Sequence, residues 1–259
     1  MILTPHHTRC PACGQFVYVM DDLLAVEPGV GIDAINGAVT GLYHYSCFKS
    51  VPWREAFLRW DAQVKNQVLD QESQYWVVLG RTEAFALALR PAIETYVLYF
   101  LTKGRRFEFH GPAAWQEFRA AIIGSQAARP IPATGPRIRV RHLTSGWELS
   151  SGLLVPVQAD FTSGDFARLR QHLADRGTDP GRRPVNLGVV CSQLGITPTR
   201  ISCPLERLIG TFSWPQAAPN PTQPVTLTVR VEQWSTVVLD DVEMQHLRDF
   251  LQSLQRPIS

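Results

Sequence analysis

The sequence has no uninterrupted apolar run long enough to span a membrane. Its longest apolar stretch, near residues 85–101, is broken by Arg90, Pro91 and Glu94, so a transmembrane helix is not expected there. The first seven residues also lack the basic and apolar regions of a secretory signal peptide. We therefore expect a cytoplasmic protein that has no membrane partner.

Cysteine is scarce, and the familiar catalytic motifs are missing. The five cysteines of the 259-residue chain are too few and too unevenly placed for a disulfide scaffold, which favours a reducing compartment. The sequence contains no phosphate-binding loop of the Gly-x4-Gly-Lys-Ser/Thr type, no dinucleotide-binding glycine fingerprint, and no nucleophile beside a base and an orienting acid. These absences argue against the common enzyme classes. An enzyme whose site is assembled from distant residues stays open as a third alternative.

The overall amino-acid composition is that of a globular protein. Hydrophobic residues make up 45% of the chain and charged residues 19%, which excludes a largely disordered chain, and the length suffices for a sizeable core. The net charge is +2, but residues 101–210 contain 15 basic and 8 acidic side chains. This distribution permits an acidic partner without requiring one.

One motif near the N-terminus carries recognisable chemistry. Cys10 and Cys13 form a C-x2-C pair, and after thirty intervening residues His44 and Cys47 form an H-x2-C pair. Three thiolates and one imidazole make a closed tetrahedral donor set, which is typical of structural zinc. His44 and Cys47 share one face if they begin a short helix. The sequence therefore predicts a single structural Zn²⁺ ion bound by these four residues.

The residues around this motif resemble a known family. Residues 10–48 are similar to the first zinc site of a LIM-type, treble-clef-like zinc finger, in which an aromatic residue precedes H-x2-C-F; Tyr43, His44, Cys47 and Phe48 match that pattern. The gap between the two ligand pairs is longer than in LIM modules, and no second C-x2-C pair follows. The resemblance implies a zinc-stabilised interaction or docking module. It does not extend to the remainder of the chain.

The chain is predicted to be an α+β protein with two parts. The zinc finger and a following helix are expected over residues 1–73, and an α+β domain over residues 75–259. In the larger domain, antiparallel sheet meanders are expected to be backed by amphipathic helices. Loops rich in Pro and Gly at residues 125–136 and 176–184 mark points near which this domain could divide.

A hairpin followed by an amphipathic helix is predicted three times in the larger domain. The hairpins are expected at residues 95–110, 137–160 and 225–239, and the helices after Pro112, after Ser163 and after an Asp240 cap with Glu243 at the capping-box position. The other expected elements are strands at residues 75–80, 85–90, 185–193 and 208–214, and a helix between residues 50 and 73 with Ser50 as its N-cap.

Arginines in the basic middle segment form a second candidate site. Three of them alternate with two apolar residues, so a strand would place all three guanidinium groups on one face. Such a face suits the phosphates of a nucleic acid, although an ordinary solvated sheet face has the same pattern. The candidate residues are Arg137, Arg139, Arg141, Arg168 and Arg170.

These observations favour a non-enzymatic zinc-binding interaction protein of the adaptor, regulatory or immunity type, with another protein as its expected partner. The alternative is a nucleic-acid-binding protein that uses the arginine-rich segment.

Overall fold

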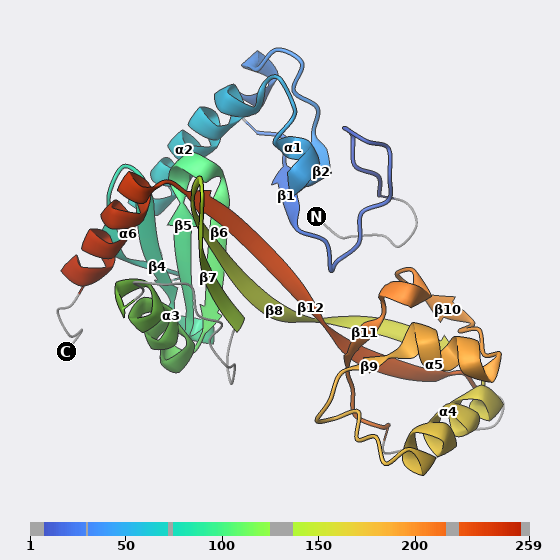
Figure 1. Ribbon diagram of the computed structural model, residues 1–259. Helices are drawn as coiled ribbons and strands as arrows, with labels where there is room; N and C mark the ends of the chain where they lie inside the picture. Colours follow the sequence, from blue (N-terminus) through green and yellow to red (C-terminus); the bar gives the residue numbers. More distant parts are fainter. Residues whose placement is uncertain (1–7, 30, 72–74, 125–136, 216–222, 255–259) are drawn as a thin grey trace. The chain divides into compact units, whose positions relative to one another are not determined.

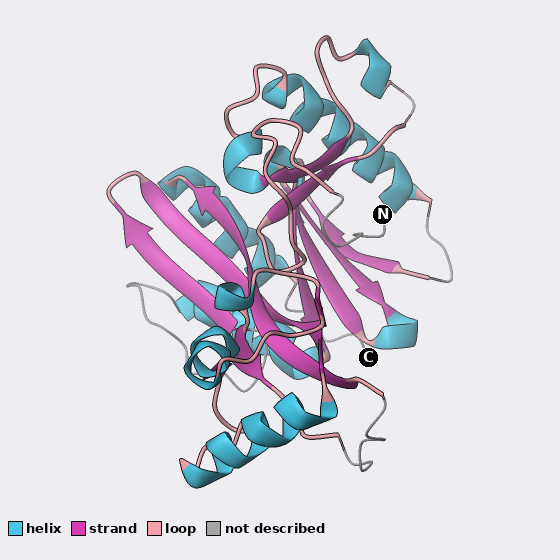
Figure 2. Ribbon diagram, turned by 90° about the vertical axis from the view of Figure 1, so that its right-hand side faces the viewer, coloured by secondary structure: helices cyan, strands magenta, loops and turns pink. Residues whose placement is uncertain are grey.

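The computed structural model describes residues 8–29, 31–71, 75–124, 137–215 and 223–254, and it confirms the α+β class. These residues form six α-helices and three antiparallel sheets (Figures 1 and 2). Within these ranges no helix combines the length and the apolar character needed to cross a membrane.

The helices are α1 (Tyr45–Phe48), α2 (Arg54–Asp70), α3 (Pro112–Gly124), α4 (Ser163–Asp175), α5 (Leu187–Leu194) and α6 (Asp241–Ser253). The strands are β1 (Leu23–Val26), β2 (Gly41–His44), β3 (Val77–Arg81), β4 (Phe85–Arg90), β5 (Thr95–Phe100), β6 (Arg105–His110), β7 (Arg137–Leu143), β8 (Gly146–Phe161), β9 (Val185–Asn186), β10 (Arg200–Ile201), β11 (Ile209–Thr211) and β12 (Val225–Leu239).

The chain forms two compact units that are interleaved in sequence. Unit 1 contains the described residues among 1–9, 15–21 and 154–233, and unit 2 contains those among 10–14, 22–153 and 234–259. Strands β8 and β12, which are neighbours in one sheet, each contribute residues to both units (Figure 1). The division into folding domains at residue 74 stays a prediction, and the 125–136 loop lies outside the described residues.

Unit 2 is built on the four-stranded sheet β3-β4-β5-β6, which is covered on both faces. Side chains alternate along β4: Phe85 and Leu87 join a core formed with α3 and α6, whereas Ala86 and Ala88 face Leu69 of α2. Strands β5 and β6 and helix α3 agree with the prediction for the first hairpin-and-helix unit, and β3 and β4 match the separately expected strands at residues 75–80 and 85–90. A sheet that is buried on both faces provides a rigid base for the residues that project from its edge.

Unit 1 contains the remaining strand segments and helices α4 and α5. Its part of β12 alternates buried residues, such as Leu227 and Val229, with exposed ones, so one face of the sheet is covered. Phe166, Leu169 and Leu173 of α4 pack on that face, as the helical spacing predicts. Thr162 caps this helix by accepting a hydrogen bond from the Asp165 amide at 3.1 Å.

Two predicted elements are wrong in kind. Residues 225–239 form one continuous strand and not a hairpin, because the expected turn at Gln233 and Trp234 has no residue that favours a turn. Residues 187–194 form helix α5 and not a strand. The Asn186 side chain accepts a hydrogen bond from the Val189 amide, and Gly195 takes up a left-handed conformation with φ 62°, so this short apolar run has a helical cap at both ends.

The helix expected between residues 50 and 73 is present but shorter. It begins at Arg54 and ends at Asp70, and its N-cap is Trp53, which makes no side-chain capping bond. Ser50 is not the cap, because its amide closes the end of α1 by donating to the Cys47 carbonyl at 3.0 Å.

The C-terminal helix α6 belongs to the core of unit 2. Asp240 and Glu243 form the predicted reciprocal capping box, with hydrogen bonds of 2.8 and 2.9 Å. Leu247 and Phe250 are buried against the four-stranded sheet, and the Phe250 ring stacks on Phe85 at 6.0 Å between centroids. Leu254 packs against the same core while remaining partly exposed.

Leu247→Ala and Phe250→Ala are therefore each expected to lower the free energy of unfolding by about 2–5 kcal/mol, because each leaves a cavity in this core. Thermal or urea unfolding measures the change. Gln252→Ala on the exposed side of α6 is the matched control and should cost less than about 0.5 kcal/mol. Equal stability of all three variants would contradict the core assignment.

Candidate metal centre

Four potential metal ligands converge near the N-terminus of the described chain. One donor atom from each of Cys10, Cys13, His44 and Cys47 lies within 4.8 Å of the other three. All four residues belong to unit 2. The structure thus brings together the four residues that the sequence motif selects.

The first pair of ligands lies on a tight turn. The Gly14 amide donates to the Cys10 carbonyl at 2.8 Å, which closes the turn around the C-x2-C pair. Gly14 has φ +70°, in the left-handed region that favours glycine. Cys10 is fully buried and Cys13 is exposed, so the turn presents the two sulfurs from the inner and outer sides of the cluster.

The second pair lies where strand β2 passes into helix α1. His44 ends the strand and is the N-cap of α1, which places Cys47 in the first turn of the helix. His44 Nδ1 lies 3.5 Å from the Cys13 sulfur and 3.9 Å from the Cys47 sulfur. The short helix that the H-x2-C spacing requires is therefore present.

These distances fit a tetrahedral ion. With metal–sulfur bonds of about 2.3 Å and metal–nitrogen bonds of about 2.0 Å, neighbouring donors of a tetrahedral zinc site lie about 3.5–3.8 Å apart. The distance from His44 Nδ1 to the Cys13 sulfur, 3.5 Å, lies in that range, and the distance to the Cys47 sulfur, 3.9 Å, lies just above it. A set of three sulfurs and one imidazole nitrogen also has the soft character that zinc sites use.

The thiols differ in acidity according to their surroundings. Burial raises the pKa of Cys10, but hydrogen bonds from the backbone amides of Cys13, His44 and Ala12 outweigh it and lower the pKa to about 7. Burial and the neighbouring thiols Cys13 and Cys10 raise the pKa of Cys47 to about 11. Like charges that converge in one place oppose each other, and a cation among them would relieve that repulsion.

The remaining cysteines lie outside this cluster. Cys191, on α5, and Cys203 are buried free thiols. Burial is the main cause that raises the pKa of each to about 11, so neither is an activated nucleophile.

An aromatic cluster supports the second ligand pair. The ring of Phe48, next to Cys47, packs edge-on against Tyr43, Trp53 and Phe57 at centroid distances of 5.4–6.4 Å. The Tyr43 hydroxyl donates to the Val39 carbonyl at 2.7 Å, which ties the strand to the preceding loop. Helix α2, which supplies Phe57, thereby holds the ligand-bearing segment in place.

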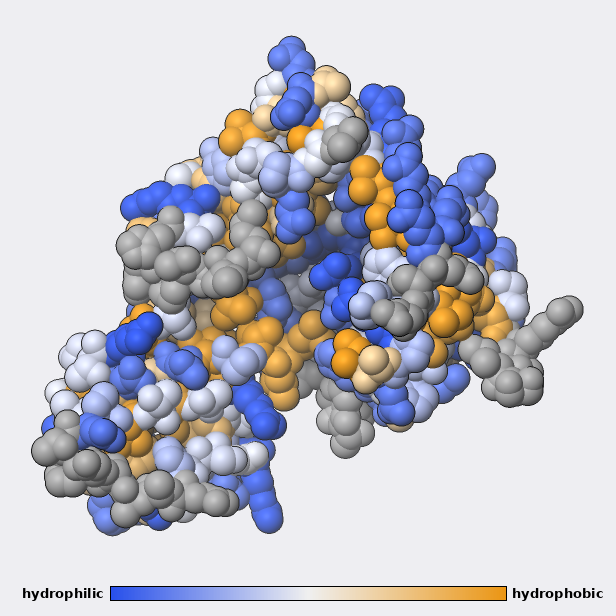
Figure 3. Space-filling view, turned by 180° about the vertical axis from the view of Figure 1, so that it is seen from behind, coloured by the Kyte–Doolittle hydropathy of each residue, from blue (hydrophilic) through white to orange (hydrophobic). Residues whose placement is uncertain are grey.

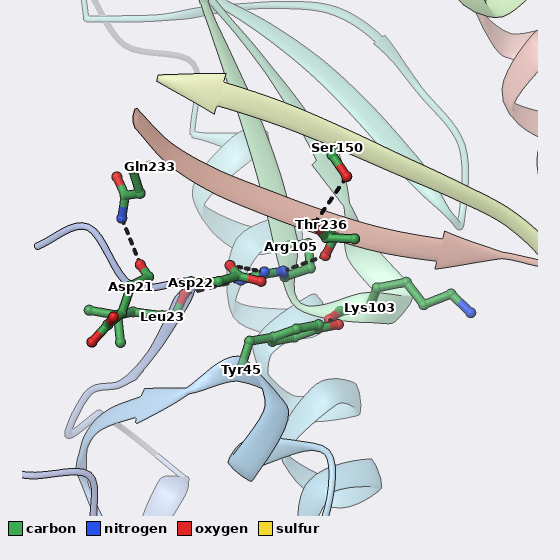
Figure 4. A network of polar contacts seen from close by, with 9 residues as sticks. All are labelled: Asp21, Asp22, Leu23, Tyr45, Lys103, Arg105, Ser150, Gln233 and Thr236. Atoms are coloured by element: carbon green, nitrogen blue, oxygen red, sulfur yellow. Dashed lines mark hydrogen bonds and ion pairs between the residues drawn. The ribbon is translucent and has the colours of Figure 1, made fainter. Parts of the chain in front are cut away.

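A buried arginine that the sequence did not reveal forms an ion pair with the segment that carries the ligands (Figure 4). Arg105, at the start of β6, pairs with Asp22, which precedes β1. Burial raises the pKa of Asp22, and the Arg105 charge acts in the opposite direction. Eighty-three positions separate the two residues in the chain, so no local pattern could have joined them.

The arginine candidates are placed in two different units. Arg137 begins β7; Arg139 and Arg141 lie on its exposed side, whereas Ile138 and Val140 are buried, as the alternation predicts. The Arg139 guanidinium lies 3.8 Å from the ring centre of Trp234, and Arg141 pairs with Glu148 at 3.6 Å.

The other two candidates lie on α4 in unit 1. Arg168 pairs with Asp165 at 3.3 Å, and the Arg170 guanidinium lies 6.0 Å from the ring centre of Trp214. They are two positions apart on either side of the buried Leu169, and helix geometry directs such side chains to different faces. The structure therefore divides these candidates between two units, and on α4 it does not place the two arginines on one face.

The purified protein is expected to contain one zinc ion per chain, because one set of four donors converges. Cys47→Ser should lose the ion and unfold the ligand-bearing segment, since metal binding stabilises the fold of a small module. Elemental analysis and thermal unfolding measure both effects. Cys203→Ser, whose thiol lies outside the cluster, is the control and should keep the ion. A metal content of zero or two, or a Cys47→Ser variant that still binds zinc, would contradict the site.

Comparison of the chain with protein-family models, with curated proteins and with solved structures produced no match.

Proposed function

We propose that this protein is a non-enzymatic zinc-binding interaction protein, in which Cys10, Cys13, His44 and Cys47 hold one structural Zn²⁺ ion. The observation that carries the proposal is the convergence of these four donor atoms within 4.8 Å. When bound, the ion would cross-link the turn at Cys10 to the start of α1. About forty residues are too few for a stable core of their own, and a metal supplies the missing stability.

The order of elements around the ligands supports a treble-clef-like module. A cysteine turn is followed by the β1–β2 hairpin and the short helix α1, with two ligands from the turn and two from the hairpin–helix junction. This is the arrangement that the resemblance to LIM-type zinc fingers implies. Such modules position surfaces for binding other proteins.

The donor set favours a structural role over a catalytic one. Catalytic zinc sites keep a coordination position open for water or substrate, whereas four protein ligands close the tetrahedron. We also propose a cytoplasmic location, because a reducing compartment preserves metal-binding thiols together with the free thiols of Cys191 and Cys203.

A protein partner is our leading proposal for what the molecule binds. Large apolar side chains reach the surface in both units, including Val39 in the loop before β2 at 53% exposure and Leu154 in β8 at 53%. On the face shown in Figure 3, hydrophobic residues are interspersed with hydrophilic ones. Non-obligate interfaces have about the same apolar fraction as the rest of a protein surface, so this mixed surface is compatible with a protein partner without selecting one.

Affinity capture tests this proposal. We expect wild-type protein to retain a protein partner after nuclease treatment, and the metal-deficient Cys47→Ser variant to lose it, because the finger that presents the surface is unfolded. Cys203→Ser serves as the control and should retain the partner. A partner that disappears on nuclease treatment of wild-type protein would instead favour the alternative function.

That alternative, nucleic-acid binding, rests on the exposed side of β7, where Arg139 and Arg141 project together. Their contacts with Trp234 and Glu148 compete with phosphate binding. We therefore expect only weak, non-specific affinity at physiological salt, with a Kd of about 10⁻⁴ to 10⁻⁶ M. A nanomolar, sequence-selective complex would reverse the order of the two proposals.

If nucleic acid does bind through β7, replacing Arg137, Arg139 and Arg141 together by Ala should weaken binding. The slope of log affinity against log salt should fall by about one for each lost phosphate contact. Arg59→Ala on the exposed side of α2 is the control for a general loss of positive charge. An unchanged salt slope would remove β7 from the interface.

A further inference from the structure

Arg105 is a buried cation whose partners come from two different parts of unit 2. Its side chain is 5% exposed, and its guanidinium pairs with the Asp22 carboxylate. It also donates to the Leu23 carbonyl at 3.0 Å and to the Thr236 carbonyl at 3.2 Å. The guanidinium carbon lies 3.5 Å from the centre of the Tyr45 ring, so an aromatic face covers the charge (Figure 4).

Three of these four partners belong to the segment that carries the metal ligands. Asp22 and Leu23 lead into β1, which pairs with β2, and Leu23 is opposite His44 in that ladder. Tyr45 directly follows His44 in the sequence, and its amide donates to the Asp22 carbonyl at 2.7 Å. All three partners are therefore connected to His44 through the strand pairing or the adjoining backbone.

Arg105 itself, and its fourth partner, belong to strands outside that segment. Arg105 begins β6 at the edge of the four-stranded sheet, and Thr236 is part of β12. The Thr236 hydroxyl lies 3.1 Å from the hydroxyl of Ser150 in β8, the strand next to β12 in the six-stranded sheet. The Tyr45 hydroxyl also donates to the Lys103 carbonyl at 3.5 Å, just before β6.

A buried guanidinium makes this arrangement sensitive to small displacements. Removing one partner of a buried ion pair leaves an uncompensated charge, which is strongly destabilising, whereas surface pairs contribute little. If β1 moved together with β2 and α1, Arg105 would lose the carboxylate, one carbonyl and the aromatic cover together.

We propose that Arg105 is a positioning residue that couples metal occupancy of the Cys10, Cys13, His44 and Cys47 site to the packing of β6 and β12. This inference rests on the proposed zinc site and goes beyond it, because it makes the site a metal-responsive element. With the ion bound, α1 holds Tyr45 against the guanidinium. Without the ion, β2 and α1 loosen and the strands that Arg105 joins lose their contact with the finger.

Coupling of this kind is reciprocal. If the ion stabilises the contacts of Arg105, those contacts must strengthen binding of the ion by the same factor. Typical coupling between two sites changes affinity by about 5–150-fold. A residue with only a local structural role would change stability without changing the affinity for metal.

The affinity for Zn²⁺, measured by competition with a chromogenic chelator, tests the coupling directly. Arg105→Met keeps most of the apolar stem and removes the charge and the donors, so zinc affinity should fall about fivefold or more. Arg106→Met is the matched control, because Arg106 is the next residue in β6, is 55% exposed and pairs with Glu108 on the same strand at 3.1 Å. It should bind zinc as wild-type protein does. Equal affinity of Arg105→Met and wild-type protein would overturn the proposal.

Hydrogen exchange of wild-type protein gives a second test that does not depend on a variant folding. Removal of zinc should accelerate amide exchange in residues 105–110 and 234–239, while residues 157–161 in unit 1 stay unchanged. Acceleration confined to residues 10–48 would overturn the coupling and leave the zinc site intact. Wild-type protein that binds no zinc would overturn the proposed function itself, and the coupling with it.

Discussion

The ion pair between Arg105 and Asp22 is the interaction on which the arrangement of unit 2 depends. Its guanidinium is almost fully buried, so each of its donors needs an acceptor inside the protein. The acceptors come from Asp22, Leu23 and Thr236, and the Tyr45 ring covers the charge. A single side chain therefore links the segment with the metal ligands to the four-stranded sheet through β6 and to the six-stranded sheet through β12.

The sheet that carries Arg105 is suited to this role because it is packed on both faces. Along β4, the large side chains Phe85 and Leu87 face α3 and α6, and the small ones Ala86 and Ala88 face α2. Small residues let α2 approach the sheet closely. The same helix packs Phe57 against Phe48 at 5.4 Å, beside the ligand Cys47. The ligand-bearing segment and the sheet are thus joined by one supporting helix and by the ion pair between Asp22 and Arg105.

Local sequence signals predicted elements well where side-chain chemistry and hydrophobic period agreed. Helix α6 is the example: its capping box at Asp240 and Glu243 and the helical spacing of the buried Leu247 and Phe250 both indicate a helix, and a helix forms there. The same signals gave a wrong prediction for residues 187–194, where a strand was expected, because a short apolar run is equally compatible with a buried strand and a buried helix. There the caps Asn186 and Gly195 decided the outcome.

The sequence by itself determined the four candidate ligands, because C-x2-C and H-x2-C spacings restrict the geometry to a turn and a helix start. It also determined the alternation that leaves Arg139 and Arg141 exposed on β7. Only the tertiary structure decided that Arg105 meets Asp22, and that the arginine candidates fall into two units. The physical reason is that spacing constrains neighbours along the chain, whereas contacts between residues 83 positions apart depend on how whole elements pack.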